Sequence, residues 1–185
     1  MKYVLAAAIV LVVALLAFHL AGASPAKTQM ITYKAAGMKA SGKAVNGYCW
    51  TGSIASSSAN AYRCMVGNNI MDPCFFVSNK VVNCPQDLAA NTGTVINLTK
   101  PLPMNKGWKG NKPWRYQVAG GSGIMCSAGT GTVIANYPYY CDGNIVCSAP
   151  QPSKLPGAYV VQCGTPTGPM SVKNKRTFFV MTAWN

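Results

Sequence analysis

The sequence has very few acidic side chains and, outside its first segment, no histidine. It contains three aspartates and no glutamate, and its one histidine, His19, lies in an apolar N-terminal run. General acid and base catalysis usually depends on a histidine or on two carboxylates held in different environments. These absences exclude most hydrolytic mechanisms and favour a function without catalysis.

Patterns of nucleophile, metal and haem sites are also missing. No Cys-x-x-Cys pair and no Cys-x-x-Cys-His occur, so zinc sites lack their usual ligands and covalent haem lacks its attachment. The serines at 53 and 56 to 58 have no histidine to activate them and no Gly-x-Ser-x-Gly turn. We therefore expect no cofactor and no metal.

One hydrolase alternative stays open. Asp72 or Asp142 would be the acid, acting on a polyanionic or glycan substrate, and two aspartates within about 10 Å in a cleft would support this mechanism. Asp72 precedes a proline, a position typical of a turn in which the carboxylate accepts backbone N–H groups. A structural role is therefore the favoured interpretation of Asp72.

Residues 1–23 predict export. A positive start at Lys2, an apolar run from Val4 to Phe18 and the small residues Ala21-Gly22-Ala23 are typical of a signal peptide. The alternative is a single membrane anchor at residues 3–20, whose 18 residues are close to the lower limit of about 17 for a span. Both interpretations place the rest of the chain outside the cytoplasm, in the periplasm or secreted.

The cysteines indicate an oxidising compartment. An even number of cysteines without close pairs, in an exported chain, predicts disulfides rather than metal sites. Pairing of neighbours, for example Cys49 with Cys64 and Cys126 with Cys141, is preferred among many open combinations. The eight are Cys49, Cys64, Cys74, Cys84, Cys126, Cys141, Cys147 and Cys163.

Short β-rich runs, interrupted by many of the 18 glycines and 12 prolines, predict an all-β fold. No stretch after the first segment has a helical period. We expect a disulfide-stabilised sandwich or barrel at 43–185, preceded by a linker or extended arm at 24–42. The runs are 44–50, 60–66, 75–83, 94–99, 114–119, 131–140, 158–163 and 177–184.

The two halves of this region resemble each other around their cysteines. This similarity predicts two related lobes, 43–103 and 113–185, with chance recurrence of turn residues as the competing explanation. In each half a Gly-Asn pair and another cysteine follow. The matching segments are Cys49-x-x-Gly52-Ser53 with Tyr62-x-Cys64, and Cys126-x-x-Gly129-Thr130 with Tyr139-x-Cys141.

The exported part is strongly basic. After residue 23 it carries fifteen lysines and arginines against three aspartates, a net charge of +12. Such an excess favours an acidic protein surface, an anionic lipid or a cell-envelope polymer as partner, with nucleic acid the least favoured. The densest group of cations and tryptophans, our candidate binding loop, is Lys106, Trp108, Lys109, Lys112 and Arg115. A solvated loop fixed by Trp114 is the competing interpretation.

Several patches resemble a group of exported bacterial proteins that have no known activity. The resemblance implies bacterial export and a disulfide-stabilised fold, and it assigns no functional residue. The patches are Cys49-Trp50, Arg63-Cys64, Asp72-Pro73-Cys74-Phe75 and the closing Ala183-Trp184.

The sequence therefore predicts a non-catalytic, extracytoplasmic binding or accessory protein with a basic surface for an acidic partner. If the first segment is retained, the alternative is a single-span accessory subunit of a membrane protein complex.

Overall fold

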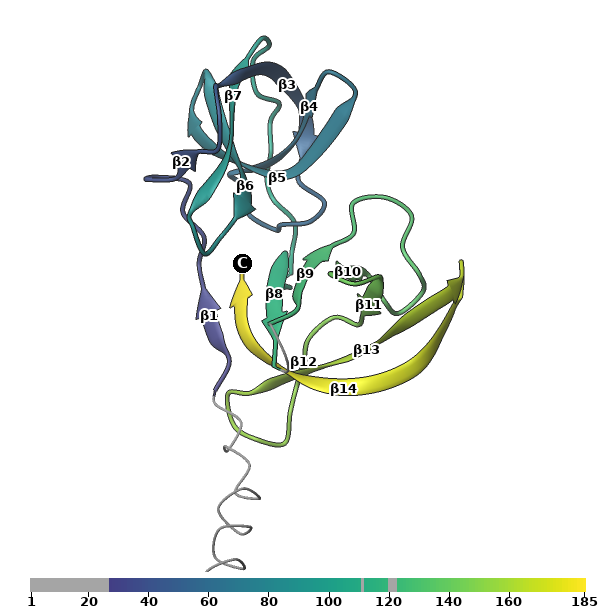
Figure 1. Cartoon of the computed structure of the whole chain (residues 1–185). Helices are drawn as coiled ribbons and strands as arrows, with labels where there is room; N and C mark the ends of the chain where they lie inside the picture. Colours follow the sequence, from purple (N-terminus) through teal and green to yellow (C-terminus); the bar gives the residue numbers. More distant parts are fainter. Residues whose placement is uncertain (1–26, 111, 120–122) are drawn as a thin grey trace, which may run out of the picture.

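The structure, a computed structural model, describes residues 27–110, 112–119 and 123–185. This part of the chain is all-β, with four disulfides and two lobes that are each built on a small closed sheet (Figure 1), which confirms the predicted fold class. The predicted export segment or anchor lies outside the described residues. Within them, no helix is long and apolar enough to cross a membrane.

The strands follow one another along the chain with mostly short connections. Two short strands, β1 and β2, precede the N lobe, which comprises β3 to β7, and the C lobe comprises β8 to β14. Their bounds are β1 Gln29–Ile31, β2 Lys39–Ala40, β3 Val45–Gly52, β4 Ala61–Val66, β5 Asn69–Ser78, β6 Val81–Asp87, β7 Thr92–Leu98, β8 Arg115–Val118, β9 Met125–Ala128, β10 Tyr139–Cys141, β11 Ile145–Cys147, β12 Gln151–Pro152, β13 Tyr159–Gly168 and β14 Ser171–Trp184.

The N lobe is a meander of five strands that closes on itself. Each strand from β3 to β7 pairs antiparallel with the next. Because the number of strands is odd, the first and the last run in the same direction, and β7 accordingly closes the barrel by pairing parallel with β3. The short β2 adds to β7 on the outside.

The C lobe closes with six strands, in the order β14-β8-β9-β10-β11-β13, with β13 paired to β14. The number is even, so every pair in the ring, including the closing one, is antiparallel. Strand β1 adds parallel to β14, and β12 adds to β13. The curved β13–β14 hairpin extends well beyond the barrel (Figure 1).

The disulfides occupy corresponding places in the two barrels. In the N lobe, Cys49–Cys64 joins β3 to β4 and Cys74–Cys84 joins β5 to β6. In the C lobe, Cys126–Cys141 joins β9 to β10 and Cys147–Cys163 joins β11 to β13. Cys49–Cys64 and Cys126–Cys141 have the same sequence separation of 15 residues. The cysteines are thus paired within each half, in the same order of strands.

Two predicted strand runs differ from the structure. The run 75–83 crosses the turn between β5 and β6, and β5 already begins at Asn69. The Asp72-Pro73 step suggested a turn, but the chain continues through it as a strand, and the pairing with β4 shifts there. The run 131–140 is mostly a loop, whose Ile134 and Tyr137 form one isolated bridge and pack on Val146. Strands β9 and β11 are too short to be recognised from their residues.

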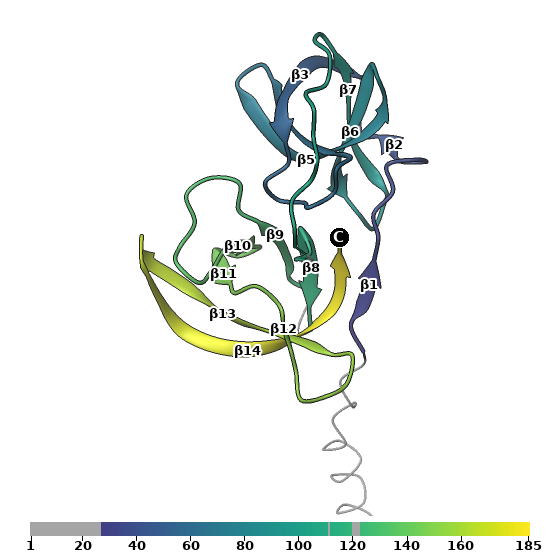
Figure 2. The ribbon, with the colours of Figure 1, turned by 180° about the vertical axis from the view of Figure 1, so that it is seen from behind.

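Three aromatic rings join the lobes and the N-terminal arm. Tyr33 of the arm, Phe75 of β5 and Trp114, which precedes β8, lie with ring centroids 4.6 to 5.7 Å apart. The chain's last strand also reaches this junction, where the carbonyl of Trp184 accepts the Trp114 N–H at 2.9 Å. Figures 1 and 2 show β1 and the C-terminus side by side at the junction from opposite directions. The two lobes therefore share one apolar contact.

Candidate functional site

The predicted binding loop lies between the lobes and is held against the N lobe. The side-chain amide of Asn105 donates to the carbonyls of Ser58, Ala59 and Ala61 at 3.3, 2.9 and 2.7 Å. These bonds fix the start of the loop against the N lobe. Lys106, Lys109 and Lys112 are exposed.

Trp108 is only partly available as a contact residue. It is 39% exposed, and its ring lies against Gly110, where an added Cβ would come within 2.2 Å of a ring carbon. The cation–ring contacts of the described residues involve other rings. In this structure Trp108 therefore stands without a cation stacked on it.

Arg115 is separated from the rest of the predicted group. Its guanidinium turns into the lobe junction, where it donates to the Gln86 carbonyl and to Ser127 Oγ, both at 2.9 Å. Burial lowers the pKa of Arg115, and the charges of Asp142 and Asp87 oppose this shift. Lys106, Trp108 and Lys109 thus stay together on the loop. Arg115 instead links the two lobes through its hydrogen bonds.

A different set of cations and rings forms a continuous row on the outer face of the N lobe. Lys100 Nζ lies 4.1 Å from the centre of the Tyr48 ring, and Tyr48 contacts Trp50 edge-on at 6.4 Å. The Arg63 guanidinium carbon lies 5.6 Å from the Trp50 ring centre. We call Lys100, Tyr48, Trp50 and Arg63 the cation–ring row.

The strand pattern explains how this row forms. In β3 the side chains alternate, so that Gly47 and Cys49 face inward while Tyr48 and Trp50 face outward. Gly47 pairs with Leu98 of β7, and this pairing brings Lys100, two residues further on, beside Tyr48. Gly47 must lack a side chain because a Cβ would meet the Met65 carbonyl at 2.5 Å.

Arg63 connects the row to the C lobe. Its Nη2 donates to the carbonyl of Thr130, in the loop between β9 and β10, at 2.7 Å. Its Nε is buried and has no hydrogen-bond partner in the described part of the chain. The row therefore ends at the Arg63 guanidinium, whose Nη2 is bonded to Thr130 and whose Nε–H has no acceptor among the described residues.

Asp72 lies next to this guanidinium and holds the loop that follows β3. Ser53 Oγ donates to Asp72 Oδ1, and the Ile54 N–H donates to Oδ2 at 3.2 Å. Burial raises the pKa of Asp72, while the bond from Ser53 and the charge of Arg63 act in the opposite direction. Its contacts are with the protein's own loop, as a structural role requires.

The other two aspartates share a shallow hollow of about 300 Å³, which also contains Arg115. Asp87 accepts the Ala90 N–H at 2.9 Å, and Asp142 accepts the Met125 N–H at 3.3 Å. A carboxylate pair performs acid and base catalysis when the two environments differ. Here both carboxylates accept a backbone N–H and face one guanidinium, so their environments are alike. The hydrolase alternative stays a prediction.

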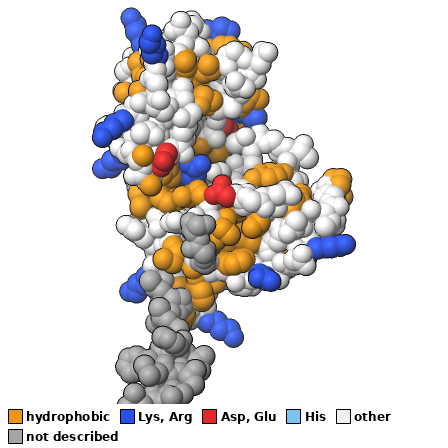
Figure 3. Space-filling view, in the orientation of Figure 1, with side chains coloured by type: hydrophobic (Ala, Val, Ile, Leu, Met, Phe, Trp, Pro, Cys, Tyr) orange, Lys and Arg blue, Asp and Glu red, His pale blue; other side chains and the backbone are white. Residues whose placement is uncertain are grey.

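Among the described residues, one group of side chains has the spacing of metal ligands. It consists of Cys126, Cys141 and Cys147, and all three are in disulfides, so they offer no thiolate. On the face seen in Figure 3, lysine and arginine side chains are spread over both lobes rather than gathered in one patch. On this face the basic charge is thus dispersed, so the arrangement of rings and cations is the better guide to a binding surface.

Sequence reasoning missed the cation–ring row because its members come from three separate segments. The loop at 105–115 stood out because its cations and tryptophans are contiguous. The alternation Tyr48-x-Trp50 was the available signal, since a strand places both rings on one face. No protein-family model, curated protein or solved structure matches the chain.

Proposed function

We propose that this protein is a non-catalytic, extracytoplasmic binding protein that holds an acidic polysaccharide of the cell envelope on the cation–ring row of its N lobe. The observation that carries the proposal is the unbroken sequence of contacts from Lys100 through Tyr48 and Trp50 to Arg63.

The order of groups in the row fits a repeating acidic sugar. The apolar face of a sugar ring packs on an aromatic side chain, and its carboxylate or phosphate pairs with a neighbouring cation. The row offers a cation, two rings and a second cation in succession, and Trp50 is 39% exposed. A polymer with one charge per sugar can engage both cations at once.

A hollow beside the row extends the cationic end. It measures about 520 Å³ and contains Lys80, Leu98, Lys100 and Leu102. Lys80 follows β5 and Lys100 follows β7, so two lysines from different connections line one hollow. A second acidic group of the same polymer would be neutralised there.

The compartment agrees with such a ligand. The structure contains four disulfides and, among its described residues, no free cysteine. Disulfides persist in oxidising environments outside the cytoplasm, which is where envelope polymers are found.

Two tryptophans of equal exposure provide a matched test. Trp50 and Trp108 are each 39% exposed, but only Trp50 has a cation stacked on its ring. With polygalacturonate as the acidic polymer and dextran as the neutral one, we expect Trp50→Ala to weaken polygalacturonate binding about tenfold, or roughly 1.4 kcal/mol. Trp108→Ala should change the dissociation constant less than about twofold, in the same calorimetric titration.

The lysines test the electrostatic part in the same way. Lys100→Gln should weaken binding and flatten its salt dependence, because one ion pair is lost, whereas Lys106→Gln removes the same charge from the loop and should do neither. Equal effects of the two variants of either pair would contradict the assignment of the site. If the protein binds anionic vesicles or an acidic protein but not polygalacturonate, an acidic polysaccharide is rejected as its ligand.

A further inference from the structure

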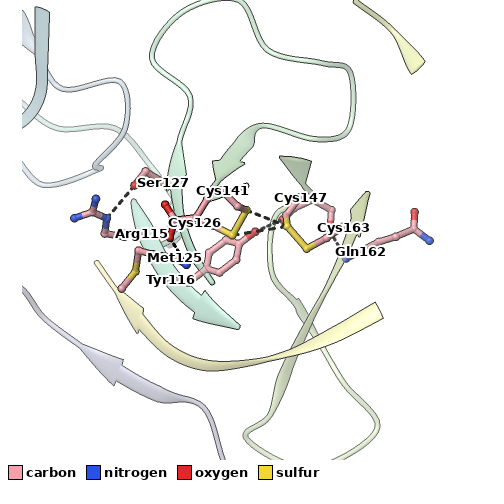
Figure 4. The surroundings of a disulfide bond; sticks show 11 residues. Arg115, Tyr116, Met125, Cys126, Ser127, Cys141, Cys147, Gln162 and Cys163 are labelled. Atoms are coloured by element: carbon pink, nitrogen blue, oxygen red, sulfur yellow. Dashed lines mark hydrogen bonds between the residues drawn. A yellow bond between two sulfur atoms is a disulfide. The ribbon is translucent and has the colours of Figure 1, made fainter. Parts of the chain in front are cut away.

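Two disulfides inside the C lobe touch each other. The Sγ atom of Cys147 lies 3.2 Å from that of Cys141 and 3.8 Å from that of Cys126 (Figure 4). A disulfide sulfur carries no hydrogen, so these are direct contacts between sulfur atoms. Cys126 and Cys147 are completely buried. One sulfur of Cys147–Cys163 thus lies within reach of both sulfurs of Cys126–Cys141.

The corresponding disulfides of the N lobe do not form such a group. Among the described cysteines, Cys126, Cys141 and Cys147 are the one set of three whose sulfur atoms all lie within 4.8 Å of one another. Strand register does not account for this difference. Cys147 is paired with Tyr139, two residues before Cys141, and Cys74 is paired with Tyr62, two residues before Cys64.

Cys163, the disulfide partner of Cys147, borders a hollow of the C lobe, and 2% of its surface is exposed. The hollow measures about 520 Å³ and is also lined by the apolar Ile124, Ile145 and Phe178. A water molecule occupies about 30 Å³ in the liquid, so the hollow has room for a small organic thiol.

A positively charged side chain also lines this hollow. It belongs to Arg176, an exposed residue of β14 that is the register partner of Cys163 across β13 and β14. Directly opposed residues point to the same face of a sheet. A cation beside a sulfur favours a thiolate, which is the form that attacks a disulfide. Arg176 therefore favours thiols that carry a negative charge.

We propose that the C lobe contains a thiol–disulfide exchange site that takes up a small carboxylate-bearing thiol at Cys163. The incoming thiolate attacks Cys163 Sγ, the Cys147–Cys163 bond breaks, and Cys147 leaves as a thiolate. The freed Cys147 side chain then turns into line with the Cys126–Cys141 bond and attacks Cys141 Sγ, which forms a Cys141–Cys147 bond and breaks Cys126–Cys141. Cys126 leaves as a thiolate and takes a proton from water.

The exchange balances without an oxidant or a reductant. One thiol enters and one thiol, on Cys126, is produced, while the two disulfides become a mixed disulfide on Cys163 and the new Cys141–Cys147 bond. The incoming thiol is thereby retained on the protein, because Cys147 is no longer free to expel it. This inference is independent of the proposed polysaccharide site.

Peptide mapping of the full chain tests the exchange. The oxidised protein is treated with 3-mercaptopropionate below the concentration that unfolds it, quenched with acid, alkylated and digested without reduction. Cleavage after Tyr139, before Asp142 and after Lys154 separates the four cysteines. We expect the mercaptopropionate mass on the Cys163 peptide, a Cys141–Cys147 cross-link and alkylated Cys126, with both N-lobe disulfides unchanged.

Three results would overturn the proposal: equal modification of the N-lobe disulfides, a mixed disulfide on Cys163 without the Cys141–Cys147 cross-link, or no reaction until the near-UV circular dichroism of the folded state is lost. The double variant C126S/C141S should accumulate only the reversible mixed disulfide on Cys163. If this variant does not fold, the peptide map of the protein without substitutions still tests the exchange.

The charge preference has its own control. At equal thiolate concentration, 3-mercaptopropionate should react several-fold faster than neutral 2-mercaptoethanol, and Arg176→Gln should remove this difference. Lys173→Gln removes an exposed cation from the same strand outside the hollow and should preserve it. A preference that survives Arg176→Gln would refute the role of Arg176.

Discussion

Two tryptophans of equal exposure have different surroundings. Trp50 and Trp108 present the same fraction of their surface, but Trp50 lies between Tyr48 and the Arg63 guanidinium, whereas Trp108 lies on Gly110. A ring with a cation already held beside it offers stacking and charge together, without the cost of bringing them together on binding. At the scale of single residues, the neighbours of a side chain therefore select the candidate site.

Asp72 should make the protein more stable as the pH falls. Because burial raises its pKa above the ordinary 3.8, the folded state binds a proton before the unfolded state does. The free energy of unfolding therefore increases as the pH falls through the raised pKa toward 3.8, and it decreases in the other direction. Urea unfolding at several pH values between about 6.5 and 3.5 measures this slope.

Asp72→Asn should flatten the slope, because asparagine does not titrate. Asp87→Asn is the control, since it replaces an exposed carboxylate that accepts one backbone N–H. An unchanged slope in Asp72→Asn would show that another group is responsible.

Among the elements, β14 has the widest role. It pairs with β1, β8 and β13, and its end reaches the junction of the lobes. In the sheet it lies between β8 and β13, so it is an inner strand of the closed barrel. The N-terminal arm depends on the same end, since the Asn185 N–H donates to the Ile31 carbonyl at 3.1 Å and Tyr33 N–H donates to Asn185 at 3.0 Å.

Deleting Trp184 and Asn185 should destabilise the fold by about 3 kcal/mol. The deletion removes the two bonds of Asn185 and the bond from Trp114 to Trp184, at roughly 1 kcal/mol each. Urea unfolding measures the loss, and Trp184→Phe, which keeps all three backbone bonds, should lose clearly less. A truncated protein as stable as the full chain would contradict the importance of this end.

For the whole molecule, the shortage of carboxylates should give resistance to acid. Acid unfolding is driven mainly by protonation of carboxylates that the folded state holds charged, and this sequence has three aspartates and no glutamate. We expect the melting temperature to change by only a few degrees between pH 7 and pH 3 in moderate salt. A loss of the folded signal above pH 3 by circular dichroism would contradict this expectation.

The sequence predicted the features that depend on local spacing and missed those that depend on assembly. The cysteine pattern of the two halves predicted local pairing, because a strand and its neighbour in a hairpin bring such cysteines together. The count of strands in each barrel could not be predicted, since β9, β10 and β11 contain only three or four residues each. Barrel closure joins β3 to β7 and β8 to β14, which are distant in the sequence.

The position of the cation–ring row could not be predicted from the sequence. The excess of positive charge predicts an acidic partner, which stays a prediction, and the group at 105–115 was chosen as the binding loop because its residues are contiguous. The pairing of β3 with β7 brings Lys100 to Tyr48, and the packing of the lobes brings Thr130 to Arg63. Both contacts join residues more than fifty positions apart, so no local pattern contains them.

The N-terminal arm enters the described part of the structure at the C lobe. Thr28 is bonded to Gly157 and Val180 of the C lobe, and the arm runs from there along β1 to the N lobe at the opposite end (Figure 1). If residues 3–20 remain in a membrane, the chain leaves that segment and reaches the C lobe before it reaches the N lobe. The N lobe, with the cation–ring row, is then the later of the two lobes along the path from the anchor.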